Sequence, residues 1–475
     1  MNKVKKIKRI HFVGIKGVGM TPLAIIAKEA GFKVSGSDIQ EEFITDPVLQ
    51  KAGIKPFVGF SKDHIQKIDL VITTGAHGGF SNEEVQFAKQ QGIQVLTQGE
   101  AVGYFMSGKL FNRVMDGISV SGTHGKTTTT GMIATLLQKA GLDPSYVIGT
   151  SSIVSLPTPG HYGKGSYFIA EADEYATEPT HDKTAKFLWQ YPKLAVITNI
   201  ELDHPDIYQS VDEMRNAFSK FTQNISQNGI LITCVDDEQV RKLLRRYQGE
   251  VITYGFSVDA HYRITKIRIS GNQTFFWLET GHASLGEFAV KVSGEHNALN
   301  ATAAVVVGLQ IGMPIEKIKK FLPAFQGSKR RLEYVGESEN GILVYDDYAH
   351  HPTEIKKTLQ ALRQAYPTQR IVCIFQPHTY SRTKKLFEQF THSFVDADEV
   401  ILVPIYASLR ESPDKSVSSE RLSQEMSMLH KAVSFLPQAQ DMVEYVKRKP
   451  YKRGTIVVTM GAGDIYKIDE LLLKS

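Results

Sequence analysis

The sequence predicts an α/β protein of three domains, each built on a largely parallel sheet. Three observations support this fold class. Apolar runs typical of strands alternate with helical stretches, which is the pattern of parallel sheets with helices on their faces. A length of 475 residues exceeds one ordinary core. Several strands end in glycine-rich or polar turns, where open α/β sheets bind ligands.

The composition narrows the class of protein. Hydrophobic residues make up 42% and charged residues 22% of the chain, and no apolar run approaches the ~18 residues of a membrane span. Cys234 and Cys373 lie in apolar runs, which argues against a disulfide framework or structural zinc and fits a reducing compartment. A formal charge of +5 suits small anionic substrates and does not indicate nucleic acid. We expect a cytoplasmic monomer or homodimer that binds neither nucleic acid nor membrane.

The N-terminal domain, expected over residues 1–106, is Rossmann-like. A strand over residues 10–13 runs into Gly14-Ile15-Lys16-Gly17-Val18-Gly19-Met20, an apolar helix follows, and the next strand ends at Ser37-Asp38. An acidic residue about 20 positions past the glycines is typical of dinucleotide-binding folds. Lys16 stands in place of the second glycine, which argues against close contact with a dinucleotide pyrophosphate. Strands over residues 70–74 and 94–97 continue the sheet.

The central domain, expected over residues 107–325, carries the most informative motif, Ser-Gly-Thr-His-Gly-Lys-Thr-Thr at residues 121–128. The motif follows an apolar strand and opens a helix. Gly122 and Gly125 let backbone amides converge on a phosphate, while Lys126 reaches the β- and γ-phosphates. The Thr127 hydroxyl suits Mg²⁺. Val120 stands where the usual P-loop has its first glycine. The sequence thus predicts a P-loop ATPase-like sheet with a particular kind of ATP loop.

Other strands of this domain bring polar groups to the same edge. Strands over residues 167–170 and 194–200 lead into Glu171-Ala172-Asp173-Glu174 and Asp203-His204, and such strand ends meet at one crevice. Carboxylates and a neutral imidazole suit a divalent ion beside ATP. Residues 262–292 alternate, which suggests antiparallel strands. A helix then opens at His296 with Asn297 and Asn300 on one face; these side chains either cap the helix or hold a base or phosphate.

The C-terminal domain, expected over residues 326–475, is again Rossmann-like, with strands over residues 342–345, 370–375, 399–403 and 455–459. Arg330-Arg331 at the boundary either act on a γ-phosphate or form a solvated basic linker. Residues 346–354 either bind a metal or form a turn capped by Asp347 or Thr353. His378 and Arg382 follow another strand and offer positive charge to an anion.

Together these motifs resemble those of the Mur ligase family, ATP-dependent amide-forming enzymes of peptidoglycan synthesis, over essentially the whole chain. The shared stretches are residues 14–20, 35–38, 122–128, 171–174, 199–204, 346–354 and 375–382. The resemblance is closest to the alanine-adding branch. It implies domains that bind a UDP-linked substrate, ATP and an amino acid. It also implies a reaction that joins L-alanine to the lactyl carboxylate of UDP-N-acetylmuramate through an acyl phosphate.

The resemblance implies roles for individual residues. In catalysis these are Lys126, Glu171, His204 and Arg331, and for Mg²⁺ they are Thr127, Glu171 and His204. The implied ATP site comprises Gly122, Thr123, His124, Gly125, Lys126, Thr127, Thr128, His296, Asn297, Asn300, Arg331 and Asp347. The implied substrate contacts are Gly14, Lys16, Gly17, Gly19, Met20, Ser37 and Asp38 for the UDP-sugar, and His350, His378 and Arg382 around the amino acid. His350 and His204 are the two candidate bases for the amine.

Three departures from the alanine-adding pattern stand out. Lys16 replaces a loop glycine, and its ammonium is expected to contact phosphate instead. Residues 175–182 replace a short acidic stretch, as in the related ligase that recycles murein tripeptide, and Thr379 replaces an arginine. The recycling ligase typically has arginine in place of His378, so alanine addition is preferred and tripeptide recycling is the alternative.

Two unrelated functions are also open to a chain with these loops. A dehydrogenase would use the N-terminal glycine loop, but Lys16 and the separate ATP loop argue against it. A P-loop motor or nucleotide-gated binding protein would hydrolyse ATP without sugar nucleotide or amino acid, whereas a ligase needs both.

Overall fold

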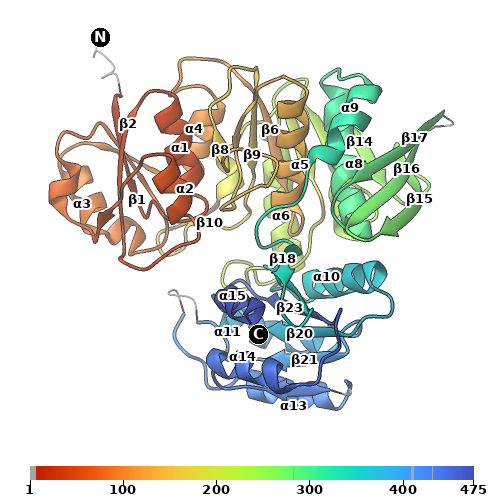
Figure 1. Cartoon of the computed structure of the whole chain (residues 1–475). Coiled ribbons are helices and arrows are strands. Elements are labelled where there is room, and N and C mark those ends of the chain that lie inside the picture. Colours follow the sequence, from red (N-terminus) through yellow and green to blue (C-terminus); the bar gives the residue numbers. More distant parts are fainter. Residues whose placement is uncertain (1–6, 282, 408–410, 431, 475) are drawn as a thin grey trace, which may run out of the picture.

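The computed structural model describes residues 7–281, 283–407, 411–430 and 432–474. It has three large sheets with helices on their faces, arranged as three domains, and a further sheet of two strands (Figure 1). The first two domains lie side by side, and the C-terminal domain, blue in Figure 1, lies beneath the central one. The predicted α/β class and three-domain architecture are confirmed. The boundaries after residues 106 and 325 stay predictions, and the basic residues 1–6 lie outside the described part of the chain.

The first sheet has five parallel strands in the order β3-β2-β1-β4-β5. β1 lies between β2 and β4 and is buried from residue 10 onward, with His11 as the one polar residue among these four. Residues 21–27 of α1 are all buried, since this helix packs on β2 and also on β7 (Ser145–Val147) and β8 (Gly160–His161) of the central domain. The elements are β1 (Arg9–Val13), α1 (Thr21–Glu29), β2 (Lys33–Asp38), α2 (Asp46–Lys51), β3 (Phe57–Val58), η1 (Lys62–Ile65), β4 (Leu70–Thr73), η2 (Gly79–Ser81), α3 (Glu83–Gln90), β5 (Gln94–Thr97) and α4 (Gln98–Met106).

The central sheet has ten strands in the order β17-β16-β15-β14-β13-β12-β6-β9-β7-β8. β9, β6, β12, β13 and β14 run parallel, so their carboxyl ends share one edge. β15, β16 and β17 pair antiparallel, as predicted for residues 262–292. The elements are β6 (Asp116–Ser121), α5 (Lys126–Lys139), β7 (Ser145–Val147), β8 (Gly160–His161), β9 (Tyr167–Glu171), η3 (Lys186–Trp189), β12 (Leu194–Ile197), α6 (Val211–Thr222), β13 (Ile230–Cys234), α7 (Glu238–Leu244), β14 (Glu250–Gly255), β15 (Tyr262–Ser270), β16 (Gln273–Thr280), β17 (Ala283–Val290), α8 (Glu295–Gln310), α9 (Ile315–Phe321) and η4 (Leu322–Ala324).

A hairpin of β10 (Ala176–Glu178) and β11 (Asp182–Ala185) interrupts the central domain between β9 and β12. It lies against the first domain: a Cβ atom added at Gly75 would lie 2.8 Å from the Pro179 side chain. One at Gly79 would collide with the Glu178 carboxylate. The stretch at residues 175–182 that departs from the alanine-adding pattern therefore bridges the first two domains.

The C-terminal sheet has six strands in the order β18-β19-β23-β20-β21-β22, and only its edge strand β18 is antiparallel. The central strands β19, β20 and β23 are buried, and the helices flank them. The elements are β18 (Glu333–Glu337), β19 (Leu343–Asp347), α10 (Pro352–Ala365), β20 (Ile371–Phe375), α11 (Tyr380–Lys385), α12 (Phe387–Thr391), β21 (Glu399–Leu402), α13 (Ser419–Ser427), β22 (Val433–Phe435), α14 (Ala439–Arg448), β23 (Ile456–Met460), η5 (Ile465–Ile468) and α15 (Asp469–Leu473).

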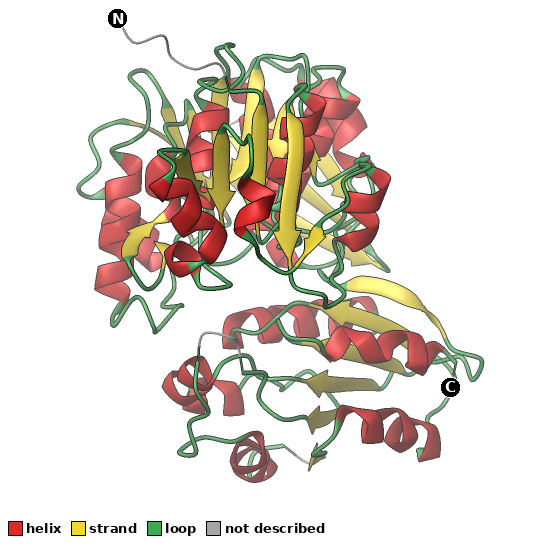
Figure 2. Ribbon diagram, turned by 90° about the vertical axis from the view of Figure 1, so that its left-hand side faces the viewer, coloured by secondary structure: helices red, strands yellow, loops and turns green. Residues whose placement is uncertain are grey.

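The domains are joined in two different ways. One apolar cluster contains both Phe12 of β1 and Phe168 of β9, so hydrophobic burial fixes the first domain to the central one. The apolar clusters of the C-terminal sheet contain residues of that domain alone. It meets the central domain through polar side chains such as those of the Arg382–Asp203 ion pair. In Figure 2 the C-terminal domain again lies beneath the other two domains. Among the described residues, no helix has the length and apolar character needed to span a membrane.

Candidate active site

The phosphate loop connects the end of β6 to the start of α5, and two glycines give it its shape. Gly122 has φ 132° and Gly125 has φ 83°, in the region that favours glycine. A Cβ at Gly122 would collide with the Thr198 hydroxyl, and one at Gly125 would lie 2.5 Å from Asn300 Oδ1. Asn300 of α8 therefore lies directly against the loop.

Asn199, two residues past β12, holds the near side of this loop. The Thr123 amide donates to the Asn199 carbonyl (3.1 Å), and the His124 amide donates to Asn199 Oδ1 (2.9 Å). The amide of Thr129 makes the first α-helical bond, to the Gly125 carbonyl (2.9 Å). The amides of residues 126–128 thus form the first turn of α5 and face outward with the positive end of the helix, which is the arrangement that binds phosphate.

Lys126 lies among carboxylates at the end of β9. Its Nζ is 2.9 Å from Glu174 Oε1 and also donates to the Gly122 carbonyl at 2.6 Å. Burial alone would lower the pKa of the Lys126 ammonium, but the charge of Glu174, with further contributions from Asp173 and Glu171, raises it. Lys126 is therefore a fixed cation at the phosphate loop.

Glu171 lies beside the helix start. Its Oε1 accepts the Gly149 amide (2.7 Å), and its Oε2 accepts the Thr127 hydroxyl (3.2 Å). Burial raises the pKa of the Glu171 carboxyl. A carboxylate and a hydroxyl thus converge next to the amides of α5, as a hard cation beside phosphate requires.

His204 completes an acidic group on the other side of Lys126. Its Nε2 is 3.5 Å from Glu174 Oε1, and ligand atoms of Asp173, Glu174 and His204 all lie within 4.8 Å of one another. His204 adopts φ 54°, an unusual conformation for a residue other than glycine. The buried Glu174 Oε2 has no hydrogen-bond partner among the described residues. These donors fit a divalent cation.

All three domains line one large cavity at this edge. From the predicted site it contains Lys126, Thr127, Glu171 and His204 of the central domain, with residues of both other domains. The first domain contributes Gly14, Gly17, Gly19 and Met20, and the C-terminal domain contributes Arg331, His350, His378 and Arg382. The structure therefore brings together residues as far apart in the sequence as Gly14 and Arg382.

Three predicted substrate residues lie behind the glycine loop and do not line the cavity. Lys16 Nζ donates to the Glu41 carbonyl (2.8 Å) and lies 3.4 Å from Asp46, so this ammonium is engaged within the first domain, and its contact with phosphate stays a prediction. Ser37 donates to Glu84 (2.5 Å), and Asp38 accepts the Lys16 amide (2.7 Å). These side chains support the loop from below.

A second cavity adjoins the phosphate loop on the α8 side. Its lining includes His124, Gly125, Thr128, His296, Asn297, Asn300, Arg331 and Asp347. Asn297 donates to the Ser293 carbonyl (2.7 Å), and burial lowers the pKa of His296 to about 3, so this imidazole is neutral. Burial raises the pKa of Asp347 to about 7. The predicted ATP residues outside the loop thus gather in this cavity.

The two arginines at the domain boundary have different environments. Arg330 is buried and donates to Asp346 (3.2 Å) and to the carbonyls of Gly461 and Gly463, so it joins strands within the C-terminal domain. Arg331 lines both cavities, and its Nη1 lies 3.7 Å from Glu354. The alternative of a solvated linker therefore does not describe Arg330, and the contact of Arg331 with phosphate stays a prediction.

Arg382 does not present a free guanidinium. Its Nε and Nη2 lie 2.9 and 2.8 Å from Asp203 Oδ1, and its Nη1 lies 3.1 Å from His378 Nδ1. The expected open fork for a carboxylate is thus already engaged across the domain interface. Only the Nη1 side faces His378, and Thr379 between them adopts φ 68°.

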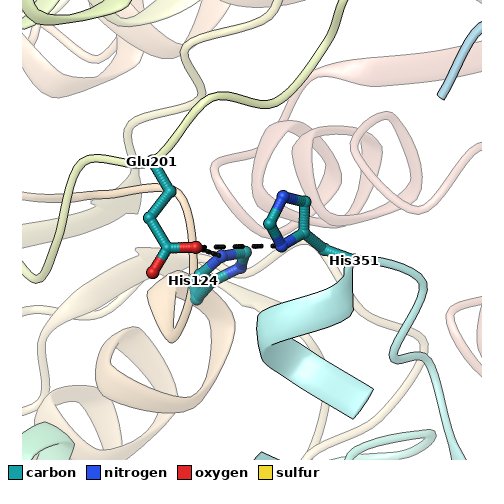
Figure 3. A group of neighbouring side chains, drawn as sticks. All are labelled: His124, Glu201 and His351. Atoms are coloured by element: carbon teal, nitrogen blue, oxygen red, sulfur yellow. Dashed lines mark hydrogen bonds and ion pairs between the residues drawn. The ribbon is translucent and has the colours of Figure 1, made fainter. Parts of the chain in front are cut away.

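Some site residues were not singled out from the sequence. The large cavity is also lined by Tyr175, Thr177 and Pro179 of the hairpin region. The sequence indicated this stretch only as a departure from the alanine-adding pattern. His124 lies beside Glu201 and His351 (Figure 3). Burial alone would lower the pKa of His124, but hydrogen bonds with Glu201 and Glu354 raise it to about 9. No spacing in the sequence links these residues, because they meet only in the fold.

Comparison with known families agrees with this geometry. The chain matches the model of the Mur ligase family catalytic domain over residues 9–110, the Mur ligase middle domain over residues 120–308, and the Mur ligase glutamate ligase domain over residues 330–463. Together these matches cover most of the chain and all three sheets.

Individual relatives match over nearly the full length. The chain is 39% identical to a UDP-N-acetylmuramate–L-alanine ligase of Desulfitobacterium hafniense (strain Y51), covering 98% of this chain and 99% of the relative. It is 39% identical to one of Geobacter sp. (strain M21), covering 98% and 97%. Among solved structures it is similar to a UDP-N-acetylmuramate-alanine ligase from Thermotoga maritima, with TM-score 0.80, 29% identity and 98% of both chains covered. A murein peptide ligase from Psychrobacter arcticus 273-4 shares the fold, with TM-score 0.69, 24% identity and 98% of both chains covered. The chain therefore belongs to the Mur ligase family.

Proposed function

We propose that this Mur ligase joins L-alanine to the lactyl carboxylate of UDP-N-acetylmuramate, at the expense of ATP, in peptidoglycan precursor synthesis. The observation that carries the proposal is the single cavity lined by all three domains, with Lys126 and the phosphate loop on one side and His378 on the other. Full-length relatives named for L-alanine support the choice of amine. The tripeptide alternative is not favoured, since the murein peptide ligase is the more distant structure.

The reaction must first activate a carboxylate, which is a poor electrophile. A lactyl carboxylate oxygen attacks the γ-phosphorus of ATP, a new O–P bond forms, and the bond to the β-phosphate oxygen breaks to release ADP. The alanine nitrogen then attacks the acyl carbon, loses its proton, and phosphate leaves. Lys126 and the amides of residues 126–128 stabilise charge on the phosphoryl oxygens, and the cavity positions the reactants.

The acidic group around Lys126 fits Mg²⁺. Thr127, Glu171 and His204 would hold the ion, since they border the phosphate loop and include the hydroxyl and carboxylate oxygens that Mg²⁺ prefers. The unpartnered Glu174 Oε2, buried next to Lys126, supports a cation there. A bound Mg²⁺ would neutralise phosphate charge.

The nucleotide and sugar sides follow from the two cavities. We place the ATP base and ribose toward His296, Asn297, Asn300 and Asp347, and the UDP-sugar against Gly14, Gly17, Gly19 and Met20. Arg331, which borders both cavities, is placed to contact the transferred phosphate. The alanine carboxylate is placed at His378 and the Nη1 side of Arg382.

His350 is the better candidate for the base that accepts the amine proton. Its Nδ1 lies 2.9 Å from the Tyr348 carbonyl and so carries the proton, which leaves Nε2 as acceptor. Burial lowers the pKa of His350 to about 4, so the ring is neutral at pH 7. For His204, burial lowers the pKa, but Asp203 and Glu174 outweigh it and favour the protonated form. We therefore prefer His350 to His204.

The experiment that tests this function is phosphate release by the purified chain with ATP and Mg²⁺. Release should require both UDP-N-acetylmuramate and an amine, and mass spectrometry should find UDP-N-acetylmuramoyl-L-alanine. Glycine, L-serine and the murein tripeptide serve as competing amines. Release without sugar nucleotide or amine would contradict a ligase, and a preference for the tripeptide would replace alanine addition by recycling.

Two further expectations are kept as proposals. The two cysteines are free and buried, which fits a reducing compartment, and we place the enzyme in the cytoplasm. A monomeric or homodimeric state stays a prediction that sedimentation would decide.

A further inference from the structure

Three side chains from separate parts of the chain meet beside the phosphate loop, apart from the acidic group around Lys126 (Figure 3). His124 belongs to the loop, Glu201 follows β12, and His351 precedes α10 of the C-terminal domain. Glu201 Oε2 lies 3.2 Å from His124 Nε2 and 3.8 Å from His351 Nδ1. Both histidines are buried, with 7% and 3% exposure.

The outer nitrogens of both rings are already hydrogen-bonded. His124 Nδ1 lies 3.2 Å from Glu354 Oε1, and His351 Nε2 lies 3.2 Å from the Leu202 carbonyl. A carbonyl only accepts, so His351 Nε2 carries the proton and Nδ1 holds the lone pair. Nδ1 accepts the Thr353 amide at 3.3 Å as the cap of α10 and lies 3.8 Å from Glu201, so a bound ion would replace this capping hydrogen bond. Metal-binding histidines are oriented in this way, with the outer N–H bonded to a carboxylate or a backbone carbonyl.

The spacing of the inner atoms also suits a tetrahedral ion. Two ligands at about 2.0–2.2 Å from Zn²⁺ lie roughly 3.4 Å apart, and the two measured separations, 3.2 and 3.8 Å, fall on either side of this value. Two imidazoles and one carboxylate suit a late first-row dication better than Mg²⁺. His124 and Glu201 also border a cavity, where a water can occupy a fourth position.

We propose that His124, Glu201 and His351 form a binding site for a zinc-type divalent cation that ties the C-terminal domain to the phosphate loop. The site uses no cysteine. The cysteine count argues only against zinc bound by cysteine and therefore does not bear on this site. Because His351 comes from the C-terminal domain and His124 from the central one, a bound ion would link two domains that otherwise meet through polar contacts. The proposal does not depend on the identity of the amine or the sugar nucleotide.

Co²⁺ is the probe, because four-coordinate Co²⁺ has intense visible absorption. The full chain, stripped of metal and free of nucleotide, is titrated with Co²⁺ in excess Mg²⁺, which fills the oxygen-rich sites. We expect one equivalent of four-coordinate Co²⁺ that Zn²⁺ displaces. Glu201→Gln keeps an acceptor for the Thr353 hydroxyl, which lies 2.6 Å away, and His351→Asn keeps a helix-capping acceptor. Each should weaken Co²⁺ binding by tenfold or more.

Two matched variants serve as controls. His161→Asn removes a histidine that also lies beside two carboxylates, Glu29 and Asp143, at 2.9 and 3.0 Å. His204→Asn removes the histidine of the acidic group around Lys126. Both should keep the Co²⁺ absorption, and thermal unfolding in chelator should show that all four variants fold.

Two results would overturn the proposal. One is the absence of four-coordinate absorption in the wild-type chain. The other is absorption that survives in both Glu201→Gln and His351→Asn, and its loss in His204→Asn would then assign the ion to the acidic group around Lys126. In each case His124 would be held by a proton between Glu201 and Glu354, with no metal.

Discussion

The two sheet edges that face each other across the cavity differ in charge. At the central edge, Lys126 and Lys186 lie among carboxylates at or just past the ends of β9 and β12, namely Glu171, Asp173, Glu174, Glu201 and Asp203. At the C-terminal edge, arginines reach toward the cavity, and Arg382 pairs with Asp203 of the opposite edge at 2.8 Å. The carboxylates differ in protonation as well: Lys186 and Lys126 hold the pKa of Asp173 below its ordinary range against burial, whereas burial raises that of Asp347 to about 7.

This difference assigns a task to each edge. Lys126 and Lys186 do not balance the carboxylates of the central edge, even though Arg382 pairs with Asp203, and this excess of negative charge supports the Mg²⁺ that we propose there. The C-terminal edge supplies a guanidinium group to the central edge, and we propose that its arginines also contact anionic substrates. Helix starts differ in the same way: the α5 amides face the cavity, whereas the amides of Tyr380 and Ser381 in α11 already donate to Glu411 (2.8 and 3.3 Å).

Loss of Lys126 from the central edge should lower turnover more than any other change considered below. Lys126→Ala removes the fixed cation at the phosphoryl oxygens, and we expect turnover to fall by roughly a hundredfold or more. Ligation at saturating ATP measures it, with Lys193→Ala, an exposed lysine paired with Asp116 at 2.9 Å, as control. A folded Lys126→Ala that keeps more than about a tenth of wild-type turnover would refute the loop assignment.

Arg382 tests the opposite edge. Arg382→Ala should raise the KM for L-alanine by about ten- to a hundredfold, equivalent to about 1.5–3 kcal/mol for a hydrogen bond to a charged group, and leave the KM for ATP nearly unchanged. Asp203→Asn separates two explanations, because Arg382 pairs with it. If Asp203→Asn alone raises the KM for alanine as much as Arg382→Ala does, Arg382 acts through the ion pair. A KM for alanine within twofold of wild type in Arg382→Ala would exclude both roles.

The metal requirement of the central edge is the third test. Glu171→Ala and His204→Ala each remove a proposed ligand, so half-maximal turnover should need on the order of tenfold more Mg²⁺. Glu29→Ala removes a carboxylate that pairs instead with His161, and it should leave the Mg²⁺ titration unchanged. Unchanged titrations in both folded ligand variants would make these residues structural.

The fourth test concerns protonation at the C-terminal edge and is measured on stability, with no change in turnover required. Burial raises the pKa of Asp347 from 3.8 to about 7, so the folded chain keeps a proton that the unfolded chain releases. Its contribution to the free energy of unfolding is therefore complete below pH 3.8 and is lost as the pH rises through about 7. Asp347→Asn should flatten this dependence in denaturant titrations, whereas Asp63→Asn, at an exposed site, should not. An unchanged slope would mean that Asp347 is ionised throughout.

Local patterns predicted much of the fold and the central edge. Apolar runs predicted the main parallel strands. Because the carboxyl ends of parallel strands meet at one edge, the sequence also predicted that Lys126, Glu171 and His204 lie in one crevice, and all three line the large cavity. The predicted ends of two strands were less accurate, because polar residues lie there. β19 continues to Asp347 because Asp346 pairs with Arg330 at 3.2 Å, and β12 stops at Ile197 because Asn199 turns to hold the phosphate loop.

Pairings between distant segments could not be predicted. Arg382 and Asp203 are 179 residues apart, and nothing local distinguishes an arginine that binds a ligand from one that pairs with aspartate. The Lys16 ammonium likewise points to Glu41 and Asp46 because the chain after β2 folds back over it. The hairpin of β10 and β11 acquires its place from contacts with Gly75 and Gly79 of another domain.

The most direct test asks whether an oxygen atom of the lactyl carboxylate is transferred to the released phosphate. UDP-N-acetylmuramate labelled with ¹⁸O in its lactyl carboxylate is incubated with ATP, Mg²⁺ and L-alanine, and the released phosphate is analysed by mass spectrometry. If the carboxylate attacks the γ-phosphate at the central edge and alanine then attacks the acyl carbon, each phosphate carries one ¹⁸O from the substrate. Phosphate without ¹⁸O, formed together with the alanine conjugate or without it, would contradict the acyl phosphate route.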